Sequence, residues 1–267
     1  MERQIIPYES ASRVAPGNAL VLAPHPDDEI FGCAGAICAH LAQGERVDVL
    51  IATDGAWGAG PDVALRKTIF ADRMAESGKA AMVLGYGKPS AWGIPDRDLW
   101  GQRTLIERIG TLIATLAPAV VYAPSVWEAH PDHRALALYG LEAVRRAKTP
   151  LTLAMYEVGM AMRPNLLLDI TAHLARKTQA MACFPSQLQA QDYVGQILAL
   201  NKYRTYTLAG NVTAAEGYFL LDKSMVARFL PSAIPADPAE RTPAAEQAWF
   251  GSIHLRPEAL LPLTSSG

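Results

Sequence analysis

Two short segments of the chain hold histidines and acids in a pattern that suits metal chemistry. The first is Pro24-His25-Pro26-Asp27-Asp28-Glu29, and the second, about 100 residues later, is Glu128-Ala129-His130-Pro131-Asp132-His133. Imidazole and carboxylate groups suit zinc, and a catalytic zinc keeps three protein ligands plus one open position for water. Two histidines and one carboxylate are available here, and a surplus acid could take the proton from an attacking water. The pattern indicates a metal-dependent hydrolytic site.

A simpler interpretation is that both segments only start helices. Each proline pushes the preceding His25 or His130 into an extended conformation and fits the first helical turn. The acids that follow lie at the positive end of the helix dipole, where a carboxylate is stabilised by ~0.3–1 kcal/mol. Capping explains the aspartates, but it does not explain why three of the six histidines fall in these two segments. We therefore favour the metal site.

The rest of the chain alternates between strand and helix patterns. Apolar runs predict strands at Ala19–Ala23, Val47–Thr53, Ser90–Ile94, Ala119–Ala123, Leu151–Val158, Asn165–Ile170 and Tyr218–Leu221. Helical patterns cover Asp28–Gln43, about 20 residues ending near Leu84, Gln102–Leu116, His133–Ala147, His173–Phe184 and Ala190–Leu208. This alternation predicts an α/β fold: a single Rossmann-like domain whose mostly parallel sheet is flanked by helices. Ligands bind outside the carboxyl ends of such strands, so the two segments should point to the same end of the sheet.

The final part of the chain differs in composition from the rest. Beyond Pro231 the sequence is dense in proline and alanine, and neither an internal repeat nor a linker separates a second core. We expect one domain over residues 1–230 and an irregular C-terminal arm over residues 231–267 packed on the same domain. The arm could cover the pocket or a subunit contact, and the sequence does not choose between them.

Composition narrows the class of partner and the compartment. The formal net charge is −2 with acids and bases spread along the chain, so no basic face for nucleic acid is expected. No run approaches the roughly 20 apolar residues that span a bilayer, and the first residues lack a secretory signal pattern. Cys33, Cys38 and Cys183 are odd in number and show no C-x-x-C spacing, which suits a reducing compartment. We expect a cytoplasmic protein with a small-molecule substrate, and a homo-oligomer stays open.

The two segments, in this order and context, resemble the PIG-L/LmbE superfamily of N-acetylglucosaminyl deacetylases and related amidases. The likeness extends from about residue 18 to residue 222. It implies that His25, Asp28 and His133 bind zinc, with ferrous iron as the alternative metal. It also implies that Asp27 is the general base and that His130, when protonated, steadies the oxyanion of the tetrahedral intermediate and could protonate the leaving amine.

Further residues are candidates for substrate binding. Arg73 matches an arginine that family members use to hold the sugar, although an ordinary helix arginine is the alternative. Asp54 and Asp96 each follow a predicted strand. Asp96 could meet a substrate hydroxyl or be a turn acid. The remaining candidates are Trp57, Trp127 and Glu128.

Each of these three residues has a structural alternative. Trp57 and Trp127 could stack on a sugar ring or pack against the wall of the site. Glu128 stands where many relatives carry a different residue, and it could orient His130 or be an ordinary loop acid. Lys177 and Gln187, from a later pattern of the same family, are expected to be structural or to lie at the pocket rim.

The sequence therefore supports a zinc N-deacetylase acting on an N-acetylated amino sugar or glycoconjugate. The first alternative keeps the site and changes the substrate to a non-sugar amide or a thiol conjugate. The second is a Rossmann-like binding protein without hydrolytic chemistry. That protein would need a glycine fingerprint after the first strand, where this chain has HPDDEIFGCAG. A catalytically silent relative would have lost a ligand or the base, and none is lost here.

Overall fold

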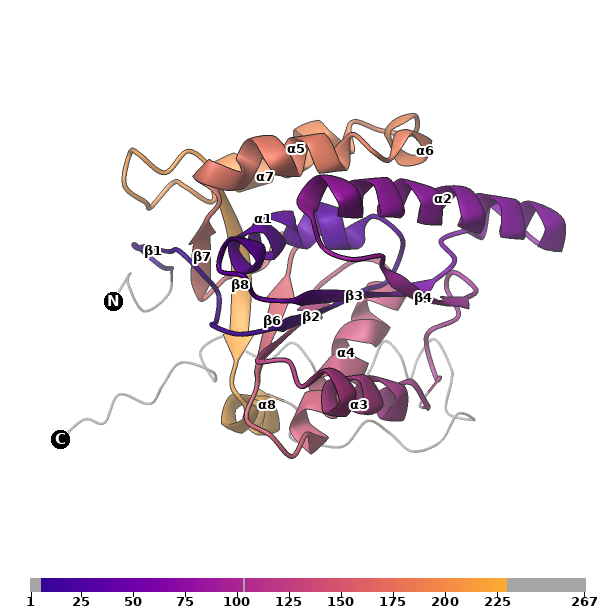
Figure 1. Ribbon diagram of the computed structural model, residues 1–267, viewed down its shortest axis with the longest axis horizontal. Coiled ribbons are helices and arrows are strands. Elements are labelled where there is room, and N and C mark those ends of the chain that lie inside the picture. The colour runs from indigo at the N-terminus through magenta and orange to yellow at the C-terminus, as the bar shows by residue number, and fades with distance from the viewer. Residues whose placement is uncertain (1–5, 103, 230–267) are drawn as a thin grey trace.

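The computed structural model describes residues 6–102 and 104–229, which fold around one eight-stranded sheet (Figure 1). The strands are β1 (Ser10–Ala11), β2 (Ala19–Ala23), β3 (Val47–Thr53), β4 (Ser90–Ile94), β5 (Val120–Pro124), β6 (Thr152–Tyr156), β7 (Leu166–Asp169) and β8 (Ala215–Leu221). The helices are α1 (Asp28–Ala42), α2 (Val63–Leu84), α3 (Thr104–Leu116), α4 (Pro131–Arg146), α5 (Leu174–Met181), α6 (Pro185–Leu188), α7 (Tyr193–Tyr203) and α8 (Lys223–Phe229). Short 3-10 turns lie at Trp57–Ala59 and Thr171–His173.

The sheet is mixed, with the strand order β1-β7-β8-β6-β5-β2-β3-β4. Among the described strands, β8 alone runs antiparallel to its neighbours, β6 and β7. The other five pairings are parallel. The mostly parallel α/β fold predicted from the sequence is confirmed.

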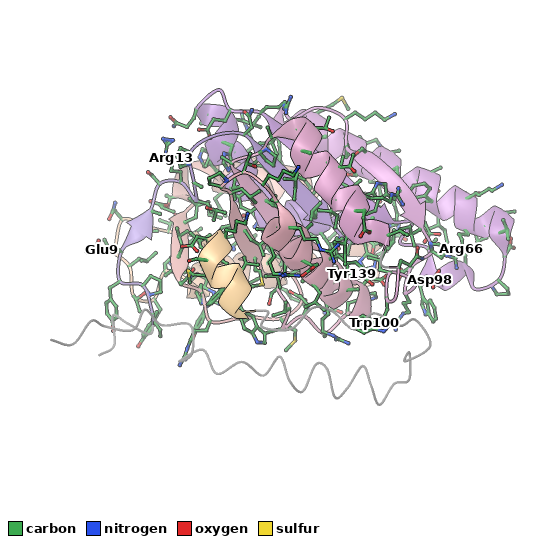
Figure 2. All side chains as sticks on the ribbon, turned by 90° about the horizontal axis from the view of Figure 1, so that it is seen from below. Glu9, Arg13, Arg66, Asp98, Trp100 and Tyr139 are labelled. Atoms are coloured by element: carbon green, nitrogen blue, oxygen red, sulfur yellow. The ribbon has the colours of Figure 1, made fainter. Side chains whose placement is uncertain are left out.

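Helices cover both faces of the sheet. In Figure 1, α1, α2, α5, α6 and α7 lie above the sheet, and α3, α4 and α8 lie below it. The lower layer faces the viewer in Figure 2. Strand β2 contributes side chains to the apolar cores on both faces of the sheet. Leu20 and Leu22 belong to the core between the sheet and helices α3 and α4, whereas Val21 belongs to the core between the sheet and α1. All five residues of β2 are buried, as expected for a central parallel strand.

The two segments that carry the histidines and acids, residues 24–29 and 128–133, are the junctions that follow β2 and β5. They meet at the point where successive strands are added on opposite sides of β2. From β2 the chain proceeds to β3 and β4 on one side, whereas β5 and β6 lie on the other. Strands β2 and β5 are hydrogen-bonded neighbours in parallel register, with Ala19 opposite Val120. Their carboxyl ends therefore open side by side at a topological switch point, which is where ligands bind in open α/β sheets.

Several elements differ from the sequence-based prediction. Helix α4 begins at Pro131 rather than His133, because proline suits the first helical position. Strand β8 is longer than the predicted Tyr218–Leu221 and starts at Ala215. The two-residue strand β1 and helix α8 were not predicted. The C-terminal arm, residues 231–267, lies outside the described residues. Within residues 6–102 and 104–229, no helix has the length and apolarity needed to cross a membrane.

Candidate active site

The first junction, residues 24–29, joins β2 to α1 through a strained backbone. Asp27 precedes the helix with φ 142°, a value that residues with a side chain rarely adopt, and its side chain caps no helical amide. The amide of Asp27 donates to the carboxylate of Glu29 at 3.0 Å, and Ser77 donates its hydroxyl to the other Glu29 oxygen. Strain of this kind costs of order 1–3 kcal/mol and persists where surrounding contacts enforce it.

The second junction, residues 128–133, joins β5 to α4 without such strain. His130 is the N-cap of α4 in the extended conformation predicted for a residue before proline, with φ −76° and ψ 133°. Its ring caps the helix, because Nδ1 accepts the amide proton of Asp132 at 3.2 Å. The proton of the neutral ring must then be on Nε2, which leaves Nε2 as a hydrogen-bond donor.

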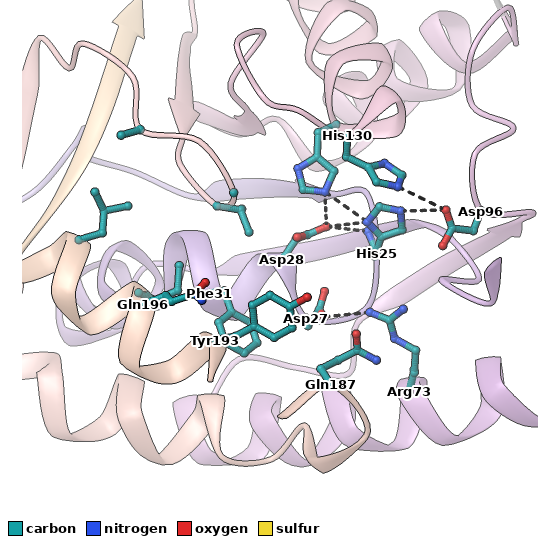
Figure 3. A pocket seen from close by; sticks show the side chains of 16 residues that line it. His25, Asp27, Asp28, Phe31, Arg73, Asp96, His130, Gln187, Tyr193 and Gln196 are labelled. Atoms are coloured by element: carbon teal, nitrogen blue, oxygen red, sulfur yellow. Dashed lines mark hydrogen bonds and ion pairs between the residues drawn. The ribbon is translucent and has the colours of Figure 1, made fainter. Parts of the chain in front are cut away.

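Three potential ligand atoms converge from the two junctions. His25 Nδ1 lies 3.1 Å from Asp28 Oδ2, and His133 Nε2 lies 3.2 Å from the same oxygen. The two ring nitrogens are 3.3 Å apart (Figure 3). Two atoms that each lie about 2.0 Å from a tetrahedral zinc are themselves roughly 3.3 Å apart, so this triangle has the size that a zinc ion requires.

Carboxylates lie behind both of these imidazole rings. Asp96 and Asp132 each place an oxygen 3.5 Å from His25 Nε2, and Glu128 Oε2 lies 3.6 Å from His133 Nδ1. A metal-binding histidine usually presents its second nitrogen to a carboxylate, which orients the ring and raises its basicity. His25 Nε2 and His133 Nδ1 are buried and lack a partner within hydrogen-bonding distance. The donor set and its support thus fit a metal centre.

The charges of the cluster are strongly coupled. Burial opposes ionisation of Asp28, yet His133 and His25 hold the pKa of this carboxyl well below its usual range. Burial likewise opposes the charged form of His25, but the carboxylates of Asp132, Asp28 and Asp96 raise its pKa. The triangle therefore holds its carboxylate in the ionised form that a metal binds.

Asp27 and His130 face the same pocket with altered acidity. Burial raises the pKa of Asp27 to about 6, against the opposing effect of Arg73, which donates to Asp27 Oδ2 at 2.9 Å. Burial together with the nearby rings of His25 and His133 lowers the pKa of His130 to about 4. The His130 and His25 rings pack edge to face, with centroids 4.5 Å apart.

A pocket of about 470 Å³ opens onto this cluster. Its lining comes from both junctions, from α2, from the segment after β6 and from α6 and α7 (Figure 3). The lining residues are His25, Asp27, Asp28, Phe31, Arg73, Asp96, His130, His133, Val158, Gly159, Ala161, Gln187, Tyr193, Gln196, Ile197 and Leu200. All five predicted metal-binding and catalytic residues therefore face one cavity.

Arg73 lines the pocket, but its guanidinium is committed to the protein. It donates to the carbonyl oxygens of Pro26 and Gly55 as well as to Asp27. Gly55 is required here, because its φ is +58° and a Cβ would lie 2.2 Å from Arg73 Nη1. The structure thus shows Arg73 bracing the first junction, a contact that the sequence did not indicate.

Asp54 and Trp57 lie outside the pocket lining. Asp54 is buried and accepts the amides of Ala56 and Asp96, both at 3.0 Å, and Arg66 pairs with its other oxygen. Asp54 therefore positions Asp96 rather than facing a substrate. Trp57 is 59% exposed, and the Arg97 guanidinium lies 4.6 Å from its ring centroid.

The other three candidates for substrate binding are Asp96, Trp127 and Glu128, and of these only Asp96 belongs to the pocket lining. Asp96 does line the pocket, with Oδ1 3.5 Å from His25 Nε2 and 3.7 Å from His130 Nε2. Trp127 packs against the lower core, with its ring 5.6 Å from that of Phe219. Glu128 is buried, and the imidazole that its Oε2 approaches is that of His133 rather than the His130 ring considered from the sequence.

Glu128 has a second set of contacts that the sequence did not reveal. Its two oxygens accept the amides of Val158, Gly159 and Met160 at 2.8–3.4 Å. The same carboxylate thus supports His133 and a segment of the pocket wall. Gln187 lies in the lining, and Lys177 is fully buried against Glu216.

Sequence reasoning overlooked two features of the site. Asp132 is fully buried and accepts the amides of Arg97 and Leu99, so it ties the loop after β4 to the second junction. The sequence feature that could have identified Asp132 is its position between His130 and His133. The α7 side of the pocket had no usable signal, because Tyr193, Ile197 and Leu200 form an ordinary amphipathic stripe.

Comparison with known proteins agrees with this geometry. Residues 20–144, which contain both junctions, match the family model "PIG-L: GlcNAc-PI de-N-acetylase". Diacetylchitobiose deacetylase of Thermococcus kodakarensis is 35% identical over 140 residues, which cover 49% of this chain and 50% of the relative. The chain thus spans about half the length of that relative.

Two solved structures show the same fold. N,N'-diacetylchitobiose deacetylase from Pyrococcus horikoshii has a TM-score of 0.69 and 22% identity, covering 82% of this chain and 86% of that one. The 4-carboxy-2-hydroxymuconate hydratase from Pseudomonas putida has a TM-score of 0.66 and 21% identity, covering 77% and 96%. A deacetylase and a hydratase share this fold, so the fold alone does not specify the reaction. Residues 20–144 of this chain are thus similar to the PIG-L family, and the chain shares the fold of these solved structures.

Proposed function

We propose that the chain is a zinc-dependent N-deacetylase that hydrolyses the acetamide of an N-acetylated amino sugar or glycoconjugate to acetate and a free amine. One observation carries the proposal: His25, Asp28 and His133 form a triangle of zinc-ligand size at the base of a pocket that Asp27 and His130 also line. The description of the matched family and the names of the deacetylase relatives support the same reaction class.

The metal and the base have separate residues in this proposal. Zinc held by His25, Asp28 and His133 would supply Lewis-acid polarisation of the amide carbonyl. Asp27 would take the proton of the attacking water, because its carboxylate faces the pocket and is not part of the triangle. The Arg73 contact holds this carboxylate in one orientation, which favours proton transfer along a fixed path.

His130 would stabilise the oxyanion of the tetrahedral intermediate. The capping contact to the Asp132 amide keeps the ring proton on Nε2, so a neutral His130 already presents a donor toward the pocket. Protonation of the departing amine, assigned to His130 by the family resemblance, remains part of the proposal. We also propose a cytoplasmic location, which is expected from the cysteines.

The first test is an amine-release assay over glucosamine derivatives. Purified protein is incubated with N-acetylglucosamine, its methyl glycosides and N,N'-diacetylchitobiose, with and without a chelator, and primary amine and acetate are quantified together. We expect equal amounts of both products, abolished by chelation and restored by zinc. Activity that withstands metal removal would contradict metal dependence. Release from none of these sugars, but from non-sugar amides or thiol conjugates assayed beside them, would favour the amidase alternative.

A further inference from the structure

The pocket has two chemically different sides. Asp96 and Arg73 lie on one side of the histidine cluster, and Phe31, Tyr193 and Gln196 lie on the other side of Asp28 (Figure 3). The second side, together with the segment after β6, contributes no charged group to the described lining. We call it the apolar side and define it as Phe31, Val158, Ala161, Tyr193, Ile197 and Leu200.

The apolar side is built into the fold rather than left by loose packing. Phe31 follows Asp28 by three residues on α1, which places both on neighbouring turns of one helix face. Tyr193, Ile197 and Leu200 share the facing stripe of α7. The Phe31 and Tyr193 rings contact edge to face with centroids 6.3 Å apart, and Phe31 and Ile197 are only 5% and 6% exposed.

An N-acetylated sugar without an aglycone would make no contact with the apolar side. An acetyl group brings a single methyl, whereas the cavity of about 470 Å³ lies within the roughly 300–1,000 Å³ range of pockets that enclose drug-sized ligands. Sugar hydroxyls are poorly placed against apolar side chains, because they lose water without gaining a partner. The hydroxyl-rich ring therefore suits the side with Asp96, and the apolar side needs another part of the substrate.

We propose that the apolar side binds an apolar aglycone, an alkyl or aryl group on the anomeric carbon of the N-acetylated sugar. This inference rests on the deacetylase function proposed above. Because the leaving acyl group is then acetyl, the aglycone is the remaining part of the substrate that can cover six apolar residues. The aglycone takes no part in the reaction: the amide C–N bond is hydrolysed, acetate departs and the aglycone stays on the product amine.

The test compares glycosides that differ only in chain length. The values of kcat/KM are measured for the methyl and hexyl N-acetylglucosaminides, in both anomers, and for N-acetylglucosamine and N-hexanoylglucosamine. Each buried methylene favours binding by about fourfold, so the hexyl glycoside should exceed the methyl glycoside by at least about tenfold. Tyr193→Ala and Leu200→Asn should each lower this hexyl-to-methyl ratio.

A matched control lies on the same helix. Tyr203 is 65% exposed at the end of α7 and does not line the pocket, so Tyr203→Ala should keep the hexyl-to-methyl ratio of the unchanged protein. Equal kcat/KM for both glycosides would overturn the aglycone site and leave the deacetylase function standing. Faster hydrolysis of N-hexanoylglucosamine than of N-acetylglucosamine would show that the apolar side binds the acyl chain. Amine release from none of them would remove the proposed function and this inference together.

Discussion

The two junctions carry similar sequences but differ in backbone geometry. The first junction places Asp27 at φ 142°, where neighbouring side chains must hold it, whereas the second places His130 at φ −76° and caps its own helix. The first junction is braced by Arg73 from α2 and by Glu29 within the junction itself. A histidine, a proline and acids can therefore start a helix without strain, so the strain at Asp27 has a separate cause. We attribute it to aiming the Asp27 carboxylate into the pocket.

The largest expected effect comes from removing either imidazole ligand. The first junction contributes His25 and the second His133, and the triangle needs both. His25→Ala and His133→Ala should each lose the bound metal during dialysis and show no measurable deacetylation, with metal content determined by elemental analysis. Full metal content in either variant would mean that the two junctions do not share one ion.

Asp27→Asn should have the next largest effect. Asparagine keeps the shape of the side chain but is too weak a base, and base catalysis is worth about 10²–10⁴ in rate. We expect kcat to fall by at least about a hundredfold at saturating substrate, as measured by amine release. A variant that retains a tenth or more of the activity would indicate that another group accepts the proton.

His130→Ala probes the unstrained junction. Removing one donor to an oxyanion costs about 10²–10³ in kcat. The metal should stay, because His130 is not among the three atoms of the triangle. Steady-state kinetics and metal content measured on the same sample separate the two effects. Normal turnover would leave His130 with its capping role alone.

The smallest expected effect is on the free energy of unfolding, and it tests the backbone strain at Asp27. Glycine adopts positive φ without steric cost, so Asp27→Gly should be more stable than Asp27→Ala by about 1 kcal/mol. Both variants lack the carboxylate, so loss of the Arg73 contact cancels in the comparison. The free energies of unfolding are compared by urea denaturation.

The second junction supplies the control for this comparison. Asp27 and His130 are both helix N-caps, where glycine is favoured over alanine, so the gain of Gly over Ala should be larger at Asp27 than at His130, whose φ is already in the ordinary range. If Asp27→Gly has no advantage over Asp27→Ala, the first junction is not strained and the contrast between the junctions disappears.

Local sequence patterns predicted three neighbouring strands and the meeting of the two junctions well. The bounds of β2, β3 and β4 are as predicted, because each is a short apolar run ended by polar or turn residues. The bracing contacts were harder to predict. Nothing local to Arg73 indicates that its guanidinium reaches back 46 residues to Asp27. The contacts of Glu128 with the amides of Val158 and Gly159 likewise depend on where β6 delivers the following segment.

Two kinds of information were absent from the sequence for physical reasons. Side-chain periodicity shows which face of α7 is apolar, but an apolar face can cover a core or line a pocket equally well. The two-residue strand β1 has no periodicity to detect, and it exists because β7 offers a parallel partner. Both features are decided by tertiary contacts, which override local preference.

The most direct test compares Asp27→Asn with Asp28→Asn, neighbours at the start of α1 that meet different partners. Asp28 belongs to the triangle, and Asp27 instead meets Arg73. Metal content and kcat are measured for both variants after dialysis and again with added zinc. We expect Asp27→Asn to keep about one metal per chain and to stay slow, whereas Asp28→Asn should lose metal and regain part of its activity with excess zinc. Loss of metal from Asp27→Asn together with its retention in Asp28→Asn would reverse the two roles and contradict the account.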